Sequence, residues 1–261
     1  NVTLSTRHVI DLSQVLITTI SYSSNRCLMR SSKAHIDRTP IICTELGKMI
    51  LNLTNVIPQG MILFVPSYNI MDHLILEWKQ TGLFEKLGKP VFVDEKSAQS
   101  QIVDQYKKSV FDGKGGLLIS VCKGRASEGI DFTDDQARAV VVFGVPYPLV
   151  TDPSVCLKEQ FNNEHPHLTN GNEWNTINAY RTVAQAVGRC IRHIKDYGSI
   201  ILIDDRFERH VQYFPKWMQP SFQHFRTIDP VISMLPSFYE KMRERFPDPI
   251  TLKHGHSLTM C

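Results

Sequence analysis

Two arginines stand close together in QAVGRCIRHI, residues 185–194, a stretch that is otherwise largely apolar. Arginine carries a planar, permanently charged guanidinium whose fork of N–H donors matches the oxygens of a phosphate. If this stretch is helical, Arg189 and Arg192 lie one turn apart and together suit a phosphate group. The other interpretation is a solvated helix face with local salt bridges, since charged helix faces are common. The spacing alone leaves both open.

A long helix over about residues 173–195 is expected to carry these arginines. At about 100° per residue, one of its faces is apolar and is predicted to pack on the core. That face contains Val183, Ala186, Val187, Cys190, Ile191 and Ile194. The opposite face follows the spacing i, i+3, i+4, i+7 and contains Gln185, Gly188, Arg189 and Arg192. Because a glycine within a helix costs about 1 kcal/mol relative to alanine, Gly188 suggests close approach by another group.

A second candidate segment, VCKGRASEGIDF at residues 121–132, directly follows the apolar run GLLIS. Gly129 would let the backbone approach a ligand, and Asp131 could accept a hydrogen bond from a hydroxyl group. Glu128 adds a second acidic side chain to the same turn. The alternative is an ordinary turn with a capping aspartate. By itself the segment is a weak signal.

The elements that must position these residues alternate between short apolar runs and helical patterns. A buried strand is predicted at 61–66, and further strands are predicted at 89–95, at the apolar runs 116–122 and 137–146, and at 199–204. Further helices are predicted at 68–78, at 97–111 with Ser97 as a cap, and around 231–245. Strands separated by such helices imply an α/β fold with a parallel sheet covered on both faces. Ligands are expected at the carboxyl ends of its strands.

The chain is predicted to have three segments. Residues 1–45 hold a leading strand within DLSQVLITTI and a polar loop over 21–39, residues 46–208 form the α/β domain, and residues 209–261 form an extension rich in aromatic residues and proline. The last residues are expected to be disordered. The first residues do not form a secretory signal. The chain also opens without methionine and in the middle of a pattern, so it is interpreted as a fragment of a longer protein.

Composition narrows the class of protein. The chain has 261 residues and a net charge of +3, so a nucleic-acid surface would have to be a local patch. It has no apolar run long enough for a membrane span, which needs about 20 residues. Six cysteines form no CxxC pair, so no metal site is predicted, and most are expected to be reduced thiols in the core. They are Cys27, Cys43, Cys122, Cys156, Cys190 and Cys261.

These segments, taken together and in this order, resemble the XPD-like iron–sulfur DNA helicases of superfamily 2. QAVGRCIRH fits the pattern Q-x-x-G-R-x-x-R of motif VI, and GRASEGIDF fits motif V. LFVPSYNIMDHL is similar to motif IV, and DYGSIILIDDRF to the strand after motif VI. The likeness covers about residues 8–220. Further short stretches are similar to two branches of this family, the regulators of telomere elongation and the Fanconi anaemia group J helicases.

The resemblance implies that the chain is a RecA-like domain, the second of two that clamp ATP with Mg²⁺ between them. Arg189 and Arg192 would be arginine fingers for the γ-phosphate, and Gln185 would position them or the attacking water. The residues implied to contact the nucleotide are Gly129, Asp131, Glu128 and Gly188. The residues implied to hold the DNA backbone are Ser67, Tyr68, Lys123 and Arg125. A packed aromatic is the alternative for Tyr68.

The sequence also departs from a complete helicase. It contains no G-x-x-x-x-G-K-[ST] phosphate loop and none of the four clustered cysteines that hold the family's iron–sulfur cluster. The resemblance therefore implies an upstream RecA-like domain that supplies both, and the chain alone should not hydrolyse ATP efficiently.

Beyond this domain, the resemblance implies 5′ to 3′ movement on single-stranded or forked DNA, roles in replication, repair or telomere upkeep, and residence in the nucleus. Two alternatives stay open. One is a non-catalytic DNA- or protein-binding module derived from a helicase, and the other is a small nucleotide-binding α/β protein.

Overall fold

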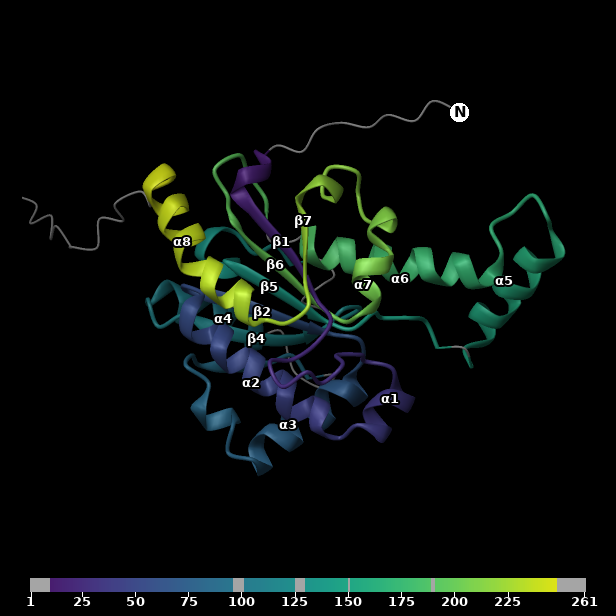
Figure 1. Ribbon diagram of the computed structural model, residues 1–261, viewed down its shortest axis with the longest axis horizontal. Coiled ribbons are helices and arrows are strands. Elements are labelled where there is room, and N and C mark those ends of the chain that lie inside the picture. Colours follow the sequence, from purple (N-terminus) through teal and green to yellow (C-terminus); the bar gives the residue numbers. More distant parts are fainter. Residues whose placement is uncertain (1–9, 96–100, 125–129, 150, 189–190, 248–261) are drawn as a thin grey trace, which may run out of the picture.

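The computed structural model describes residues 10–95, 101–124, 130–149, 151–188 and 191–247. Within these ranges seven strands form one sheet in the order β3-β4-β2-β5-β6-β1-β7, with all neighbours parallel (Figure 1). The strands are β1 Val15–Ile20, β2 Gly60–Val65, β3 Val91–Val93, β4 Gly116–Val121, β5 Ala139–Phe143, β6 Gly198–Ile203 and β7 Phe222–Phe225. The predicted parallel sheet is confirmed.

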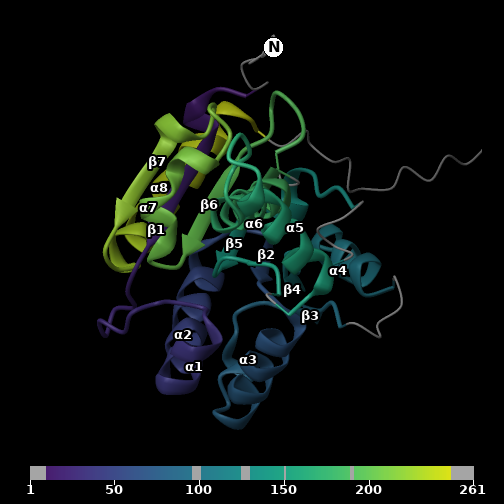
Figure 2. The same cartoon turned by 90° about the vertical axis from the view of Figure 1, so that its right-hand side faces the viewer.

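Helices cover both faces of this sheet (Figure 2). One face carries α2 Ile41–Val56, α3 Tyr68–Gln80 and α8 Asp229–Arg245. The other carries α4 Gln101–Phe111, α6 Gly171–Val187 and α7 Arg206–Arg209. Two more helices are α1 Lys33–Arg38 and α5 Pro153–Glu164, and α5 projects beyond the sheet together with the first turns of α6 (Figure 1). Short 3-10 turns are η1 Leu12–Gln14, η2 Phe84–Lys86, η3 Asp134–Ala137, η5 Val211–Tyr213 and η6 Gln219–Ser221.

The inner strands are buried along their whole length because helices cover them on both sides. Every residue of β1, β2, β4, β5 and β6 is buried, whereas the edge strands β3 and β7 are partly exposed. Strands of this kind have continuous apolar sequences rather than alternating ones. The apolar runs therefore predict their positions closely.

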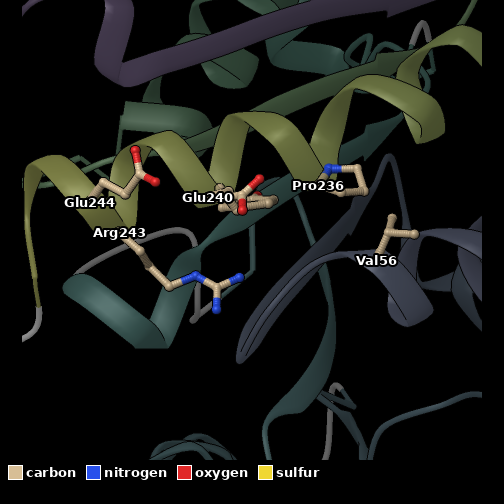
Figure 3. A pocket seen from close by; sticks show the side chains of 6 residues that line it. Val56, Pro236, Glu240, Arg243 and Glu244 are labelled. Carbon is tan, nitrogen blue, oxygen red and sulfur yellow. The ribbon is translucent and has the colours of Figure 1, made fainter.

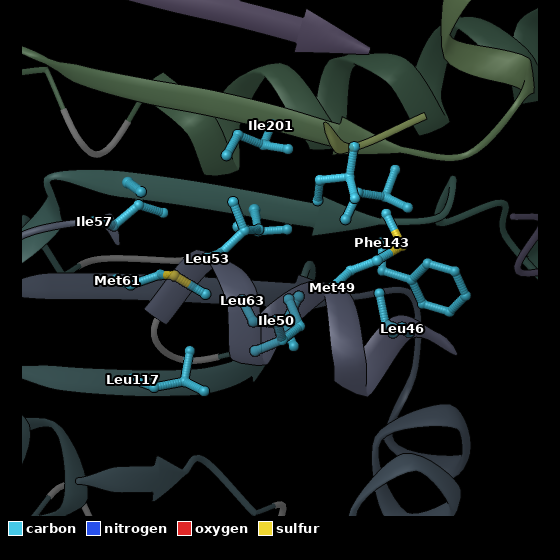
Figure 4. Close-up of a cluster of buried hydrophobic side chains, with 14 of the residues drawn as sticks. Leu46, Met49, Ile50, Leu53, Ile57, Met61, Leu63, Leu117, Phe143 and Ile201 are labelled. Atoms are coloured by element: carbon cyan, nitrogen blue, oxygen red, sulfur yellow. The ribbon is translucent and has the colours of Figure 1, made fainter. Parts of the chain in front are cut away.

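Helix α2 supplies much of the core on its face of the sheet. Its apolar residues recur at helical spacing and contact side chains of β2, β4, β5 and β6 (Figure 4). The side chains labelled there are Leu46, Met49, Ile50, Leu53, Ile57, Met61, Leu63, Leu117, Phe143 and Ile201. Burying one such side chain stabilises the fold by about 1.5–3 kcal/mol, so α2 is a principal support of the sheet.

The helix predicted over about 173–195 ends earlier than expected. Helix α6 ends at Val187 with Gly188 as its cap, and residues 191–197 are not helical. Ile194, which the prediction placed on the core face, is 67 % exposed. Arg192 therefore does not share a helical face with Gln185, and the stripe predicted from helical spacing is wrong. Hydrogen bonds from distant residues to this loop, described below, hold it in its non-helical path.

Other segments differ in smaller ways. The polar stretch 21–39, predicted as a loop, contains α1 and an isolated bridge between Tyr22 and Leu28. Neither α2 nor α5 was predicted as a helix. Strand β1, from the predicted first segment, lies between β6 and β7 of the common sheet. The carboxyl-terminal extension supplies β7 and α8. Ser97 and residues 248–261 lie outside the described residues.

The cysteines fall into different environments. Cys43 and Cys122 are buried, and burial raises the pKa of their thiols to about 11 and about 12. Cys27 is half-buried and Cys156 is exposed, so Cys156 is not a core thiol. Cys190 and Cys261 lie outside the described residues. No helix in the described ranges is both long and apolar enough to cross a membrane.

Candidate functional site

The predicted site residues lie at the two opposite ends of the parallel strands. These ends are called the carboxyl edge and the amino edge of the sheet. Ser67, Tyr68 and Lys123 follow the carboxyl ends of β2 and β4. Asp131 and Arg192 instead lie in the segments that lead into the amino ends of β5 and β6. The prediction that ligands bind at the carboxyl ends thus covers only the first group. Four further predicted residues lie outside the described part of the chain, namely Arg189, Gly129, Glu128 and Arg125.

At the carboxyl edge, the loops after β2 and β4 approach each other. The Ser67 hydroxyl caps α3 by accepting a hydrogen bond from the N–H of Ile70 at 3.4 Å. Tyr68 is half-buried against the core, and a Cβ on Gly124 would lie 3.5 Å from its hydroxyl. Lys123 is exposed beside them. The packed position of Tyr68 fits the interpretation of a packed aromatic.

The carboxyl edge also carries two ion pairs that the sequence analysis did not find. Arg30 Nε donates to Asp205 Oδ1 at 2.8 Å, and Arg206 Nη2 donates to Asp204 Oδ2 at 2.7 Å. Burial alone would raise the pKa of Asp205, but the hydrogen bond and charge of Arg30, together with the charges of Arg209 and Arg206, hold it below its ordinary value. Asp204 also accepts from the N–H of Ser31 at 3.0 Å. The Arg30–Asp205 pair and the bond from the Ser31 N–H fasten the segment around residue 30 to the end of β6.

Glycine is required where this segment meets β5. Gly144 has φ +85°, in the left-handed region, and a Cβ there would lie 2.0 Å from the Ser31 hydroxyl oxygen. Both the backbone conformation and the close contact exclude a larger side chain. The carboxyl edge is therefore a tightly built surface.

At the amino edge, Arg192 forms an ion pair with the carboxylate of Asp131. The two side chains are 30 % and 58 % exposed. An ion pair this exposed contributes about 0–1 kcal/mol to stability, because water competes for both charges. Motifs V and VI thus meet at the solvent-exposed ion pair of Arg192 and Asp131, which is called the rim. Neither of its two charged groups is buried.

Beneath this rim lies a buried ion pair between Arg138 and Asp196, which are 2 % and 0 % exposed. Arg138 Nη1 donates to Asp196 Oδ1 at 3.2 Å and to the carbonyl of Tyr197 at 3.0 Å. Burial raises the pKa of the Asp196 carboxyl, although the N–H of Arg192 and the charge of Arg138 oppose the rise. The sequence analysis missed both residues. The available signal was a charged residue just before each of two buried apolar strands.

The remaining predicted residues of motif VI lie on or next to α6. Gln185 is exposed on the helix. Gly188 has an ordinary φ of −65°, and a Cβ there would meet no described atom within 4 Å. Among the described residues, neither backbone conformation nor packing requires glycine at that position.

A cavity of about 780 Å³ lies next to the Arg192 loop, between η3 and the end of α8. Arg138, His193, Tyr197 and Phe246 are among its lining residues. A second groove, of about 520 Å³, runs between α2 and α8, and none of its lining residues is a predicted site residue. Figure 3 shows Glu240, Arg243 and Glu244 along α8 in that groove. Of these two, the first lies beside a predicted site residue, because its lining residue His193 follows Arg192.

Three side chains near Arg192 could in principle hold a metal ion. Asp134, His193 and Asp196 each offer a ligand atom, and these atoms lie within 4.8 Å of one another. His193 Nε2 is already 2.9 Å from Asp134 Oδ1, and Asp196 is paired with the Arg138 guanidinium. A cation at this place would meet a buried arginine, which disfavours a metal site.

Comparisons with known proteins identify the family. The family described as "Helicase C-terminal domain" matches residues 50–221. A Fanconi anemia group J protein homolog from Gallus gallus is 35 % identical over 257 residues, covering 92 % of this chain and 20 % of the relative. A regulator of telomere elongation helicase 1 homolog from Drosophila erecta is 35 % identical over 226 residues, covering 83 % and 23 %. The chain thus spans about a fifth of the length of these relatives.

Solved structures agree on the fold. One described as XPD_APO matches with a TM-score of 0.57 and 21 % identity, over 80 % of this chain and 40 % of that one. S. cerevisiae Dbp5 bound to RNA and ADP BeF3 matches with a TM-score of 0.51 and 13 % identity, over 89 % and 46 %. These likenesses confirm the predicted RecA-like fold. The family match and the two sequence relatives show that this chain belongs to the helicase C-terminal domain family.

Proposed function

We propose that this chain is the carboxyl-terminal motor half of an ATP-dependent DNA helicase that moves 5′ to 3′. One observation carries the proposal: Arg192 of motif VI and Asp131 of motif V, far apart in sequence, meet in an exposed ion pair at an open rim. Such a rim fits a nucleotide that is held mainly by a second domain. The names of the two relatives support DNA repair or telomere upkeep as the process, and hence residence in the nucleus.

The chemistry proposed for this rim is charge stabilisation. The guanidinium of Arg192 would exchange the Asp131 carboxylate for the oxygens of the γ-phosphate. Breaking the Arg192–Asp131 ion pair costs little free energy, because the pair is exposed to water. Asp131 would then accept a hydrogen bond from a ribose hydroxyl. Motif VI also contains Arg189 and Gln185, and we propose that they assist in the roles implied by the resemblance.

The other half of the site must come from outside this sequence. ATP with its Mg²⁺ needs a phosphate loop, which the sequence lacks. We propose that an upstream RecA-like domain supplies that loop and carries the iron–sulfur cluster. In this arrangement Arg192 stabilises the charge that develops as the phosphoryl group is transferred.

A size measurement tests this arrangement. An antibody against this chain, used on a cell extract, is expected to detect a polypeptide far larger than 29.8 kDa. A band near 29.8 kDa, with no copurifying phosphate-loop protein, would overturn the motor proposal. It would favour the non-catalytic binding module instead.

DNA is proposed to run along the carboxyl edge. There Lys123 is exposed, and Ser67 and Tyr68 approach the loop after β4. Contacts from such groups to phosphates hold the backbone without reading the bases. Arg125 would add a further phosphate contact. Nucleotide and DNA would thus bind at opposite ends of the motif V segment, which gives the domain a way to couple them.

Replacing Lys123 with alanine is expected to weaken single-stranded DNA binding about equally for all sequences. A single lost phosphate contact should reduce the slope of log K against log salt by about 1. Fluorescence anisotropy of the native polypeptide at several salt concentrations measures both effects. Lys114→Ala is the matched control, since Lys114 is an exposed lysine before the opposite end of β4. An unchanged slope in the Lys123 variant would contradict the assigned contact.

A further inference from the structure

We infer that Arg138 and Asp196 are positioning residues for Arg192, and that their buried ion pair sets the place of the arginine relative to Asp131. The inference rests on the proposed function, because it concerns how the proposed arginine finger is held. Neither residue was among the predicted site residues. The hydrogen bonds of the loop 191–197 support this role.

The carboxylate of Asp196 organises this loop. It accepts hydrogen bonds from the N–H of Arg192 at 3.1 Å and from the N–H of Tyr197 at 3.0 Å. On the other side, Gln14 Nε2 donates to the carbonyls of Ile194 at 2.9 Å and Asp196 at 2.8 Å. The backbone of the loop is thus fixed, while the Arg192 side chain stays 30 % exposed at the rim.

Arg138 connects this loop to the end of motif V. Its Nε donates to Asp135 Oδ1 at 3.0 Å, and its guanidinium lies 4.0 Å from the ring centre of Tyr197. Asp135 belongs to η3, which closely follows Asp131 in the chain. A single buried guanidinium therefore contacts both segments that bear the ion-paired groups of the rim.

Helix α8 in turn holds the backbone of Arg138. The Tyr239 hydroxyl donates to the Arg138 carbonyl at 2.6 Å and accepts from the Ser199 hydroxyl, whose oxygen is 2.7 Å away. The Ser199 N–H donates to the same carbonyl at 2.9 Å. The carboxyl-terminal extension is therefore part of the support for the nucleotide rim.

Stability alone does not account for this ion pair. A pair of apolar side chains of similar volume is often equally stable or more stable than a buried ion pair, because desolvating two charges is costly. Burial raises the pKa of Asp196, so its ionised form lowers the free energy of unfolding once the pH has risen through the folded-state pKa. The charges instead fix the geometry of the loop. The Asp196 carboxylate accepts hydrogen bonds from two backbone N–H groups and from the guanidinium of Arg138.

The test compares two changes that each neutralise a buried carboxylate. Asp196→Asn in the native polypeptide is expected to lower kcat for ATP hydrolysis about 100-fold, as a misplacement of about 1 Å can. The KM for ATP should change less than about 3-fold, because the loss is felt in the transition state. Glu45→Gln, on α2, is the matched control, since Glu45 is 2 % exposed and paired with Lys48. It should leave kcat unchanged.

A double-mutant cycle separates positioning from general damage. In an Arg192→Ala background, Asp196→Asn should cause no further loss, because the group that it positions is gone. Losses that multiply, or an unchanged kcat in Asp196→Asn alone, would overturn the positioning role. If Arg192→Ala itself hydrolyses ATP normally, the proposed function fails instead. The two failures are thus distinguishable.

A second variant covers the case in which Asp196→Asn does not fold. Arg138→Met combined with Asp196→Leu removes both charges, so no unpaired charge stays buried. It should keep a cooperative thermal transition and still lose about 100-fold in kcat. A folded double variant with normal kcat would overturn the inference.

Discussion

Replacing Arg192 with alanine in the native polypeptide is expected to lower kcat for ATP hydrolysis by about 10³-fold or more. Arginines that stabilise a transferring phosphoryl group in related enzymes contribute about 10³–10⁵ to the rate. The domain should stay folded, because the ion pair that the variant loses with Asp131 is exposed and contributes about 0–1 kcal/mol. Steady-state ATPase assays with saturating single-stranded DNA, together with a thermal melt, measure both quantities.

Two further variants sharpen this prediction. Arg192→Lys keeps the charge but loses the planar fork of donors, so it should recover only part of the rate. Arg181→Ala is the matched control, because Arg181 is an exposed arginine one turn before Gln185 on α6. It should hydrolyse ATP normally. Turnover of Arg192→Ala equal to that of the control would refute the arginine-finger assignment.

The largest loss of stability is expected from Trp78→Ala, at about 3–5 kcal/mol in the free energy of unfolding. Trp78 is fully buried between α2 and α3, and its Nε1 donates to the carbonyl of Cys43 at 2.8 Å. Alanine would leave a large cavity and remove the hydrogen bond that joins α3 to α2. The fit on α2 is close, since a Cβ on Gly47 would lie 2.6 Å from Trp78 Nε1.

Urea denaturation of this chain measures the change. Trp174→Ala is the control, because Trp174 lies half-exposed on the part of α6 that projects beyond the sheet. Its replacement should cost about 1 kcal/mol or less. A similar cost for both variants would mean that Trp78 is not the anchor of α2 and α3 that the packing indicates.

The sequence predicts the strands well and the ends of some helices poorly, for physical reasons. A strand such as β5 is buried on both faces, so its whole apolar run is visible in the sequence. The end of α6 is different. Apolar residues continue at helical spacing to Ile194, but hydrogen bonds to Asp196 and from Gln14 hold the loop in another path. The bond from Gln14 joins residues 180 positions apart, too distant in sequence for local propensity to reveal.

The candidate site, too, could be predicted from the sequence only in part. The motif residues Arg192 and Asp131 could be found from residue type and order, and the structure brings them together. Arg138 and Asp196, which support them, could not be found in this way. They stand 58 positions apart and belong to no phosphate-binding pattern. Helix α2 is not among the predicted helices, and its amphipathic spacing begins directly after the polar stretch 21–39.

The position of β1 has a consequence for how the chain folds. This early strand lies between β6 and β7, which are made near the other end, so Gln14 bonds to a residue 182 positions later. Closing so long a loop makes folding slow relative to chains with local contacts. During synthesis the apolar β1 segment must wait, without its neighbours, until nearly the whole domain has left the ribosome. Truncation before β6 should therefore yield an aggregating intermediate rather than a smaller folded domain.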